Sequence, residues 1–268
     1  MQKLLRLLFT FSLFATWPAF AGVAVIGGLT RQHTVKPGEA FEGVLLVKNT
    51  GKAPLEINFT QTDYTFTADG ESHYDKPGTH PRSNARWIAL NPPRATIPPL
   101  ETVSIYYQGR MPDAATLAGT YWSMIMVEPV AAHAPLAEGG QNQVAMGVQA
   151  VMRYAVQVIT TLGTSGTEQL AILDKKMLTE AGKSVLQLDV ANTGERMQTP
   201  TLSAELFNAQ GVSIGHFHGG RQRIYPQCSV RFKIEFADVP PGKYLAMVVM
   251  DSGSDYVTGA QYTLEIAP

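Results

Sequence analysis

The chain has 268 residues, of which 45% are hydrophobic and 16% charged, and its formal net charge at pH 7 is −1. Because a nucleic-acid-binding domain calls for a basic patch, this charge balance argues against nucleic acid as a partner. The single cysteine, Cys228, cannot form an internal disulfide, so the fold must be held by its hydrophobic cores. The 24 glycines, 17 prolines and many β-branched and aromatic residues are typical of short strands joined by turns.

Residues 1–21 predict a cleaved signal peptide. Two positive charges in Met1–Arg6 precede an apolar run, Leu7–Trp17, and the small residues of Ala19–Ala21 form a cleavage site. We expect cleavage between Ala21 and Gly22. The alternative, a transmembrane anchor, needs about 20 apolar residues, and this run is shorter. The sequence therefore predicts an exported protein without stable membrane insertion.

Two passages of the chain resemble each other and indicate a duplication. Gly38–Gly51 and Gly182–Gly194 are alternating strands that end in Asn-Thr-Gly, whose Asn and Gly we expect to form a turn because both tolerate positive φ. Each half then carries Gly-x-Tyr ahead of another strand, at Gly119–Tyr121 and Gly242–Tyr244. This tyrosine is either the tyrosine corner of immunoglobulin-like domains or an ordinary core residue.

A repeat this long indicates a duplicated domain rather than a solenoid. Short strands with regular turn signals then predict an all-β fold of two tandem immunoglobulin-like β-sandwiches. We place the N-terminal domain at residues 22–163 and the C-terminal domain at residues 164–268. The short Gly/Ser linker between them, near Gly163–Gly166, is expected to allow a bend.

The first domain ends in an unusually long predicted strand, Val144–Leu162, which follows a small-residue loop at Glu128–Gly140. A long edge strand with an apolar face is an aggregation liability, unless the edge is used to pair with an extended segment of another protein. A central strand buried on both sides is the alternative, and the pattern leaves both open. The candidate docking face holds Val144, Met146, Val148, Ala150 and Met152.

With its signal peptide, two immunoglobulin-like domains, loop and long alternating strand, the sequence resembles the periplasmic chaperones of the chaperone–usher pilus assembly pathway. The resemblance covers the layout of most of the chain and is specific over residues 22–162; the aromatic-Arg-Pro ending of the family's donor strand is absent. It implies that the long strand is donated to a pilus subunit. It also implies that Arg31 and Arg153 bind the subunit's C-terminal carboxylate, whose geometry a guanidinium matches. The alternative is that both are ordinary surface arginines.

The resemblance further implies a periplasmic protein whose partners are pilus subunits, with an outer-membrane usher as a further candidate, and which needs no cofactor. A second hypothesis is a surface or cell-wall protein whose immunoglobulin-like modules bind or adhere. A third is a sugar-binding accessory domain acting through Trp87 or Trp122, although the strand position of Trp122 favours the core.

Other residues give little indication of chemistry. His216 and His218 share one face of a strand, but two imidazoles are too few for a tight metal site. A nucleophilic Cys228 would need an activating base, and no histidine is near it in the sequence. Gly-x-Ser-x-Gly and phosphate-binding glycine loops are absent from the sequence. We therefore expect no enzyme and no metal site.

Overall fold

The computed structural model describes residues 22–130, 152–253 and 256–267. Apart from one short 3₁₀ helix, η1 (Ala85–Trp87), the regular structure in these ranges is entirely β, which confirms the predicted all-β fold class. The first part contains β1 (Val23–Ile26), β2 (Thr30–Val35), β3 (Ala40–Asn49), β4 (Leu55–Phe66), β5 (Ser72–Asp75), β6 (Ile88–Asn91), β7 (Arg94–Ile97), β8 (Thr102–Arg110), β9 (Gly119–Pro129) and β10 (Tyr154–Leu162). The second part contains β11 (Leu170–Glu180), β12 (Lys183–Asn192), β13 (Thr201–Phe207), β14 (Ser213–Arg221), β15 (Ser229–Phe236), β16 (Gly242–Asp251) and β17 (Val257–Ile266).

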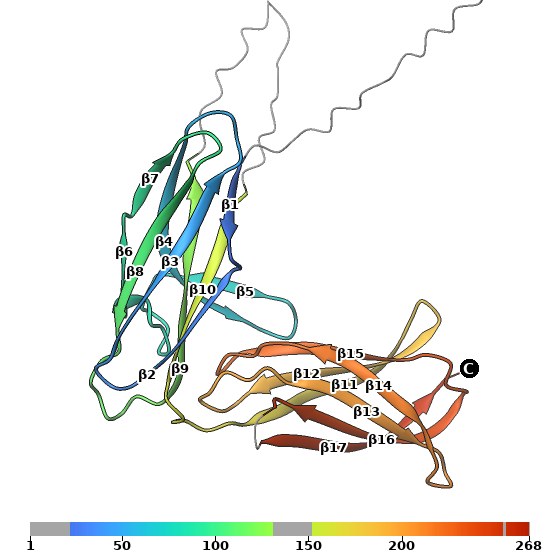
Figure 1. The fold of residues 1–268 in the computed structure, drawn as a ribbon. Coiled ribbons are helices and arrows are strands. Elements are labelled where there is room, and N and C mark those ends of the chain that lie inside the picture. The colour runs from blue at the N-terminus through green and yellow to red at the C-terminus, as the bar shows by residue number, and fades with distance from the viewer. Residues whose placement is uncertain (1–21, 131–151, 254–255, 268) are drawn as a thin grey trace, which may run out of the picture.

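Strands β1–β10 form an N-terminal sandwich of two sheets, as Figure 1 shows. One sheet has the order β1-β3-β8-β6, and the other has the order β2-β10-β9-β4-β5, with β7 also paired to β4. The alternation predicted for β3 holds, because Phe41, Leu45 and Val47 are buried between the sheets. The chain leaves the first sheet after β1 and enters the second at β2 through Gly27 and Gly28, whose φ values of +85° and +86° favour glycine.

Strands β11–β17 form the C-terminal sandwich from sheets β11-β12-β15 and β14-β13-β16-β17. Leu186 and Leu188 of β12 face Leu202 and Leu206 of β13 across a core in which all four are fully buried. Val185 and Gln187 on the other face of β12 are also buried, so the alternation of this strand separates its two faces only in part.

The repeated Asn-Thr-Gly segments form the predicted turns as Asx turns, in which the asparagine side chain accepts the N–H two residues later, and not through the expected positive φ. Neither the asparagines nor the glycines of these segments have positive φ, so they do not form a left-handed turn. In addition, Asn49 and Asn192 are buried hydrogen-bond centres. The Asn49 side-chain amide donates to the carbonyls of Ala53 and Ile97, and that of Asn192 donates to the carbonyls of Arg196 and Ile224. Each asparagine side chain also accepts the backbone N–H two residues later.

The two Gly-x-Tyr motifs have different roles. The Tyr244 hydroxyl donates to the Pro240 carbonyl at 2.9 Å, which is the tyrosine-corner arrangement. Tyr121 is a core residue whose ring lies against Trp87, with 4.8 Å between ring centroids.

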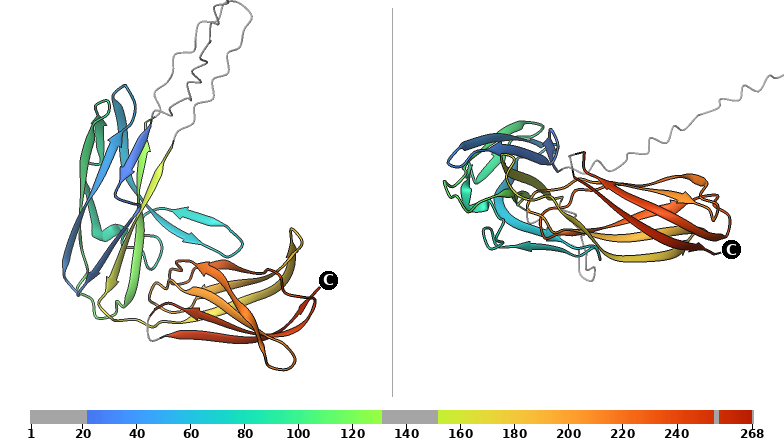
Figure 2. Two further views of the ribbon diagram at one scale, coloured as in Figure 1. Left: turned by 45° about the vertical axis from the view of Figure 1, so that its right-hand side comes forward. Right: turned by 90° about the horizontal axis from the view of Figure 1, so that it is seen from below.

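The two sandwiches lie at an angle to each other, and the hairpin of β4 and β5 extends from the first toward the second (Figures 1 and 2). At the tip of this hairpin, the Ala68 N–H donates to the Ser229 hydroxyl of the second sandwich at 2.9 Å. Trp122 of β9 stacks on Tyr225, with centroids 4.5 Å apart and planes inclined by 6°. The bend expected at the linker is therefore held by side-chain contacts between the sandwiches.

Candidate functional site

Strand β10 is central in one part and open in another. Gln157–Leu162 lies between β2, which runs parallel to it, and antiparallel β9. Pairing with β2 begins at Gln157, opposite Thr30, whereas pairing with β9 begins three residues earlier, at Tyr154. Among the described residues, Tyr154–Val156 therefore has a neighbour on one side only. Each of the two alternatives raised by the sequence applies to a different part of the strand.

The open side of β10, which we call the β10 edge, is available because β1 belongs to the other sheet. The Gln157 N–H donates to the Leu29 carbonyl at 2.9 Å, so the backbone groups of Gln157 point toward β2. Backbone groups alternate in direction along a strand, so those of Ala155 point the same way, where β2 has not yet begun.

The predicted docking residues lie mostly outside the described part of the chain. Val144, Met146, Val148 and Ala150 fall in the range 131–151, and their role remains a prediction. Met152 is described, and it is 60% exposed just before β10 begins. An exposed methionine beside an open strand edge is available to a partner.

The structure does not bring the two predicted carboxylate-binding arginines together. Arg31 lies opposite Val158, and its guanidinium donates to the carbonyls of Gly27, Gly28 and Thr30, each at 3.1 Å. Arg153 forms an ion pair with Glu128 at 3.4 Å and has a side chain that is 65% exposed. An extended chain separates Arg153 from Val158 by about 16 Å and places the two arginines on opposite faces of the sheet. They lie at the two ends of the β10 edge.

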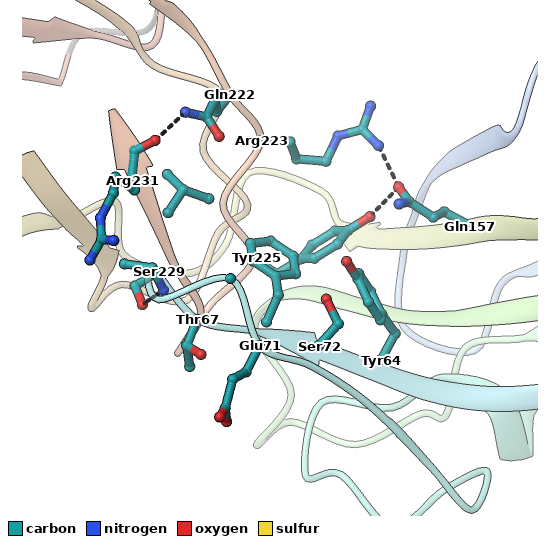
Figure 3. A pocket seen from close by; sticks show the side chains of 14 residues that line it. Tyr64, Thr67, Glu71, Ser72, Gln157, Gln222, Arg223, Tyr225, Ser229 and Arg231 are labelled. Carbon is teal, nitrogen blue, oxygen red and sulfur yellow. Dashed lines mark hydrogen bonds between the residues drawn. The ribbon is translucent and has the colours of Figure 1, made fainter. Parts of the chain in front are cut away.

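A pocket of about 530 Å³ lies between the β4–β5 hairpin, β10 and the C-terminal sandwich, and we call it the junction pocket (Figure 3). Its walls include Tyr64 and Phe66 of β4, Gln157 of β10, and Arg223 and Tyr225 of the second sandwich. No sequence signal predicts this site, because Arg223 and Tyr225 belong to no recognisable motif and are far from Gln157 along the chain.

In the part of the chain that the structure describes, the side chain of Arg223 in the junction pocket has only neutral hydrogen-bond partners. Its Nη1 donates to Gln157 Oε1 at 2.6 Å and to Thr30 Oγ1 at 3.2 Å. Its Nε is buried without a hydrogen-bond partner among the described residues. Tyr225 donates its hydroxyl to the same Gln157 oxygen at 2.7 Å, and burial raises the pKa of Tyr225. An arginine held only by neutral acceptors can still receive an anion.

Arg231, which also lines the pocket, differs from Arg223. Its Nε and Nη2 both donate to the carboxylate of Asp189, each at 2.7 Å, in a bidentate pair. The charge of Arg231 is thus already compensated, which leaves Arg223 as the better candidate for an anionic ligand.

The remaining candidate residues show ordinary structural roles. Cys228 is buried, and burial raises its thiol pKa to about 11, far from what a nucleophile requires. His216 lies 3.3 Å from Glu205, and across the described ranges no three His, Cys, Asp or Glu side chains are grouped as a metal site would need. Trp122 is buried at the domain junction, so it is not available to a sugar. In the part of the chain that the structure describes, no helix is long and apolar enough to cross a membrane.

No protein-family profile matches the chain, and no curated protein sequence matches it either. Among solved structures, it is similar to a chain of a chaperone–tip adhesin complex of CFA/I fimbriae biogenesis, at 11% identity over 91% of this chain and 98% of that chain, with a TM-score of 0.48. It is also similar to the class 5 fimbriae chaperone CfaA, at 11% identity over 92% of this chain and 100% of that chain, with a TM-score of 0.46. A third similar structure is the Pseudomonas aeruginosa CupB2 chaperone, at 13% identity over 91% of this chain and 100% of that chain, with a TM-score of 0.40.

All three are described as chaperones or as a chaperone complex, two of them of fimbriae. What the chain binds has to be argued from its own residues.

Proposed function

We propose that the protein is a periplasmic chaperone-like protein that binds an extended segment of a pilus subunit by strand complementation at the β10 edge. The observation that carries the proposal is a strand edge that, within the described ranges, has no neighbour and ends beside a pocket whose Arg223 has no carboxylate partner there. An added strand gains affinity from backbone hydrogen bonds and selectivity from side chains on alternate positions. Such binding needs neither catalysis nor a cofactor, and an outer-membrane usher is a further proposed partner.

The arginines have separate proposed roles along the bound segment. The segment would pair with Ala155 and the residues before it, with apolar contacts to Met152 and to the predicted docking residues. It would end near the turn that precedes Thr30, which Arg31 braces through backbone carbonyls. We propose that Arg223, which lies on the Thr30 and Gln157 face of the sheet, receives the terminal carboxylate there, that Arg31 supports the site through this turn, and that Arg153 contacts the segment further along the edge.

The first experiment is affinity purification of the tagged protein from the periplasm of its own host, with partners identified by mass spectrometry. We expect a stoichiometric subunit partner that is lost from Arg223→Gln and weakened in Arg31→Gln and Arg153→Gln. Arg94→Gln is the matched control, because Arg94 is an exposed arginine paired with Glu56 on β4, away from the β10 edge.

A second variant tests the edge itself. Ala155→Pro removes an N–H that faces the open side while sparing the hydrogen bonds to β9, so partner binding should be lost without loss of folding. Should fractionation place the protein on the cell surface, with all of these variants retaining their partners, the chaperone proposal fails. The binding or adhesive protein is then the better hypothesis.

A further inference from the structure

A histidine lies in the contact that holds the two sandwiches together. His80 lies in the loop between β5 and η1, and its ring centroid is 5.1 Å from that of Trp122. Trp122 in turn stacks on Tyr225 of the second sandwich, and its indole N–H donates to the Tyr64 carbonyl at 2.7 Å. His80 therefore packs on the tryptophan that joins the domains and that contacts two residues of the junction pocket.

A hydrogen bond determines which form of His80 fits this loop. The Arg82 backbone N–H donates to His80 Nδ1 at 3.1 Å. Only a ring with an unprotonated Nδ1 can accept this bond. In the protonated ring Nδ1 carries its own hydrogen, which would point at the Arg82 N–H. The neutral imidazole is thus part of the folded arrangement.

Arg82 extends the same loop to the second sandwich. Its guanidinium contacts Glu195, through Nη1 to the carbonyl oxygen and through Nη2 to Oε1, both at 3.3 Å. It also donates to the Ala118 carbonyl at 3.0 Å, just before β9. Protonation of His80 at Nδ1 therefore affects two sets of contacts between the domains: the stacking of Trp122 on Tyr225 and the hydrogen bonds of Arg82 to Glu195.

The charged groups that face His80 come from three segments. Burial and the Arg82 guanidinium lower its pKa, Asp63 of β4 and Asp75 of β5 raise it, and the net result is a pKa below the ordinary 6.5. Burial raises the pKa of Asp63. Hydrogen bonds from the loop, including the His80 N–H and the Ser83 hydroxyl, outweigh burial and bring that pKa below 3.8. Asp63 thus remains ionised throughout the range in which His80 titrates.

We propose that His80 is a proton-sensitive latch on the domain junction: its protonation at mildly acidic pH breaks the Arg82 N–H···Nδ1 bond and loosens the contact between the two sandwiches. The junction pocket shares Tyr64 and Tyr225 with this contact, so it opens with it. The inference concerns the junction and does not depend on the ligand proposed above.

The direction follows from linkage. A histidine whose pKa is lowered by folding contributes its full stability above 6.5, and this contribution is lost as the pH falls through the lowered pKa. The corresponding loss from Asp63 begins only as the pH approaches 3.8. Between pH 6.5 and pH 3.8, therefore, the change in stability at this contact comes from His80 and not from Asp63.

Calorimetry and small-angle X-ray scattering of the signal-free protein between pH 7.5 and pH 5.0 test the latch. We expect one joint thermal transition at pH 7.5, and two transitions with a larger radius of gyration at pH 5.0. His80→Asn places Oδ1 where Nδ1 accepts the Arg82 N–H but cannot titrate, so it should keep the joint transition at both values. His73→Asn is the control, since His73 is an exposed histidine near Glu71, and it should behave like the unaltered protein.

Two results would overturn the proposal: a junction that is unchanged at pH 5.0, or one that loosens equally in His80→Asn. The second result would implicate another histidine, such as His33, which is partly buried against Phe41 in the N-terminal core. Should His80→Asn fail to fold, an NMR titration of the unaltered protein decides the matter. The midpoint of the His80 ring must then coincide with the midpoint of the scattering change, and separate midpoints refute the latch.

Discussion

Replacing Asn49 and Asn192 by alanine tests whether the repeated Asn-Thr-Gly segments hold the sandwiches together through buried side-chain amides. The side chains are enclosed to the same degree, with Asn49 1% and Asn192 0% exposed. They differ in which backbone groups lose a hydrogen-bond partner when the side chain is removed. The two substitutions can therefore be compared within one protein.

The expected loss can be worked out from the contacts. Asn49 makes four hydrogen bonds, and its removal leaves the Gly51 N–H and the Ala53 carbonyl without their partner. Asn192 makes three, but the Gly194 N–H keeps a second acceptor in the Gln169 carbonyl. At about 1 kcal/mol for each net hydrogen bond, we expect a loss of about 4 kcal/mol for Asn49→Ala and about 3 kcal/mol for Asn192→Ala.

The assay is urea-induced unfolding, followed by far-ultraviolet circular dichroism and by tryptophan fluorescence. Thr193→Ala is the control from the same segment, because its hydroxyl is exposed and the change should stay within about 0.5 kcal/mol. Losses below about 1 kcal/mol for both asparagines, or a larger loss for Asn192→Ala than for Asn49→Ala, would refute the account of these residues as hydrogen-bond centres.

Three further predictions concern other parts of the fold. Gly119→Ala should separate the thermal transitions of the two domains, because the φ of Gly119 is +78° and the new Cβ would overlap the Glu195 carbonyl of the second sandwich. Gly28→Ala is the control: φ is +86° there but the space is open, so the substitution should cost only about 1–2 kcal/mol of backbone strain. Native Cys228 should resist thiol reagents at pH 8 and react only after unfolding, since burial raises its thiol pKa to about 11; rapid labelling of the folded protein would contradict its burial. Tyr244→Phe should destabilise the C-terminal sandwich by about 1 kcal/mol through loss of the hydrogen bond to Pro240, as measured by its thermal midpoint.

Local patterns were reliable guides to the strands but not to the roles of single residues within them. The alternation in β3 identified its buried face, because side chains on successive strand residues point to opposite faces whatever the partner strand is. In β12, Val185 and Gln187 on the second face are buried as well. The asparagines of the repeat form the expected turns, but as Asx turns rather than through positive φ. Their further role as buried hydrogen-bond centres was not predicted, because the Ile97 and Ile224 carbonyls that they reach come from distant segments.

At the candidate site, too, the roles of single residues could not be predicted from local sequence. Arg31 and Arg153 were chosen from a resemblance in layout, and the register of β2 against β10 places them at opposite ends of the edge. Arg223 carries no motif, and it became a candidate only because folding brings it within 2.6 Å of Gln157.

The sequence by itself determined that this is a duplicated all-β chain with two buried cores, because strand periodicity, turn residues and repeats are local properties. Tertiary structure alone decided that, among the described residues, β10 has two neighbouring strands at one end and one at the other, since this depends on where β1 ends and β2 begins. It also decided which residues meet at the domain junction. Strand pairing and the packing of one domain on another join segments far apart in the chain, and no local pattern encodes which edge remains free.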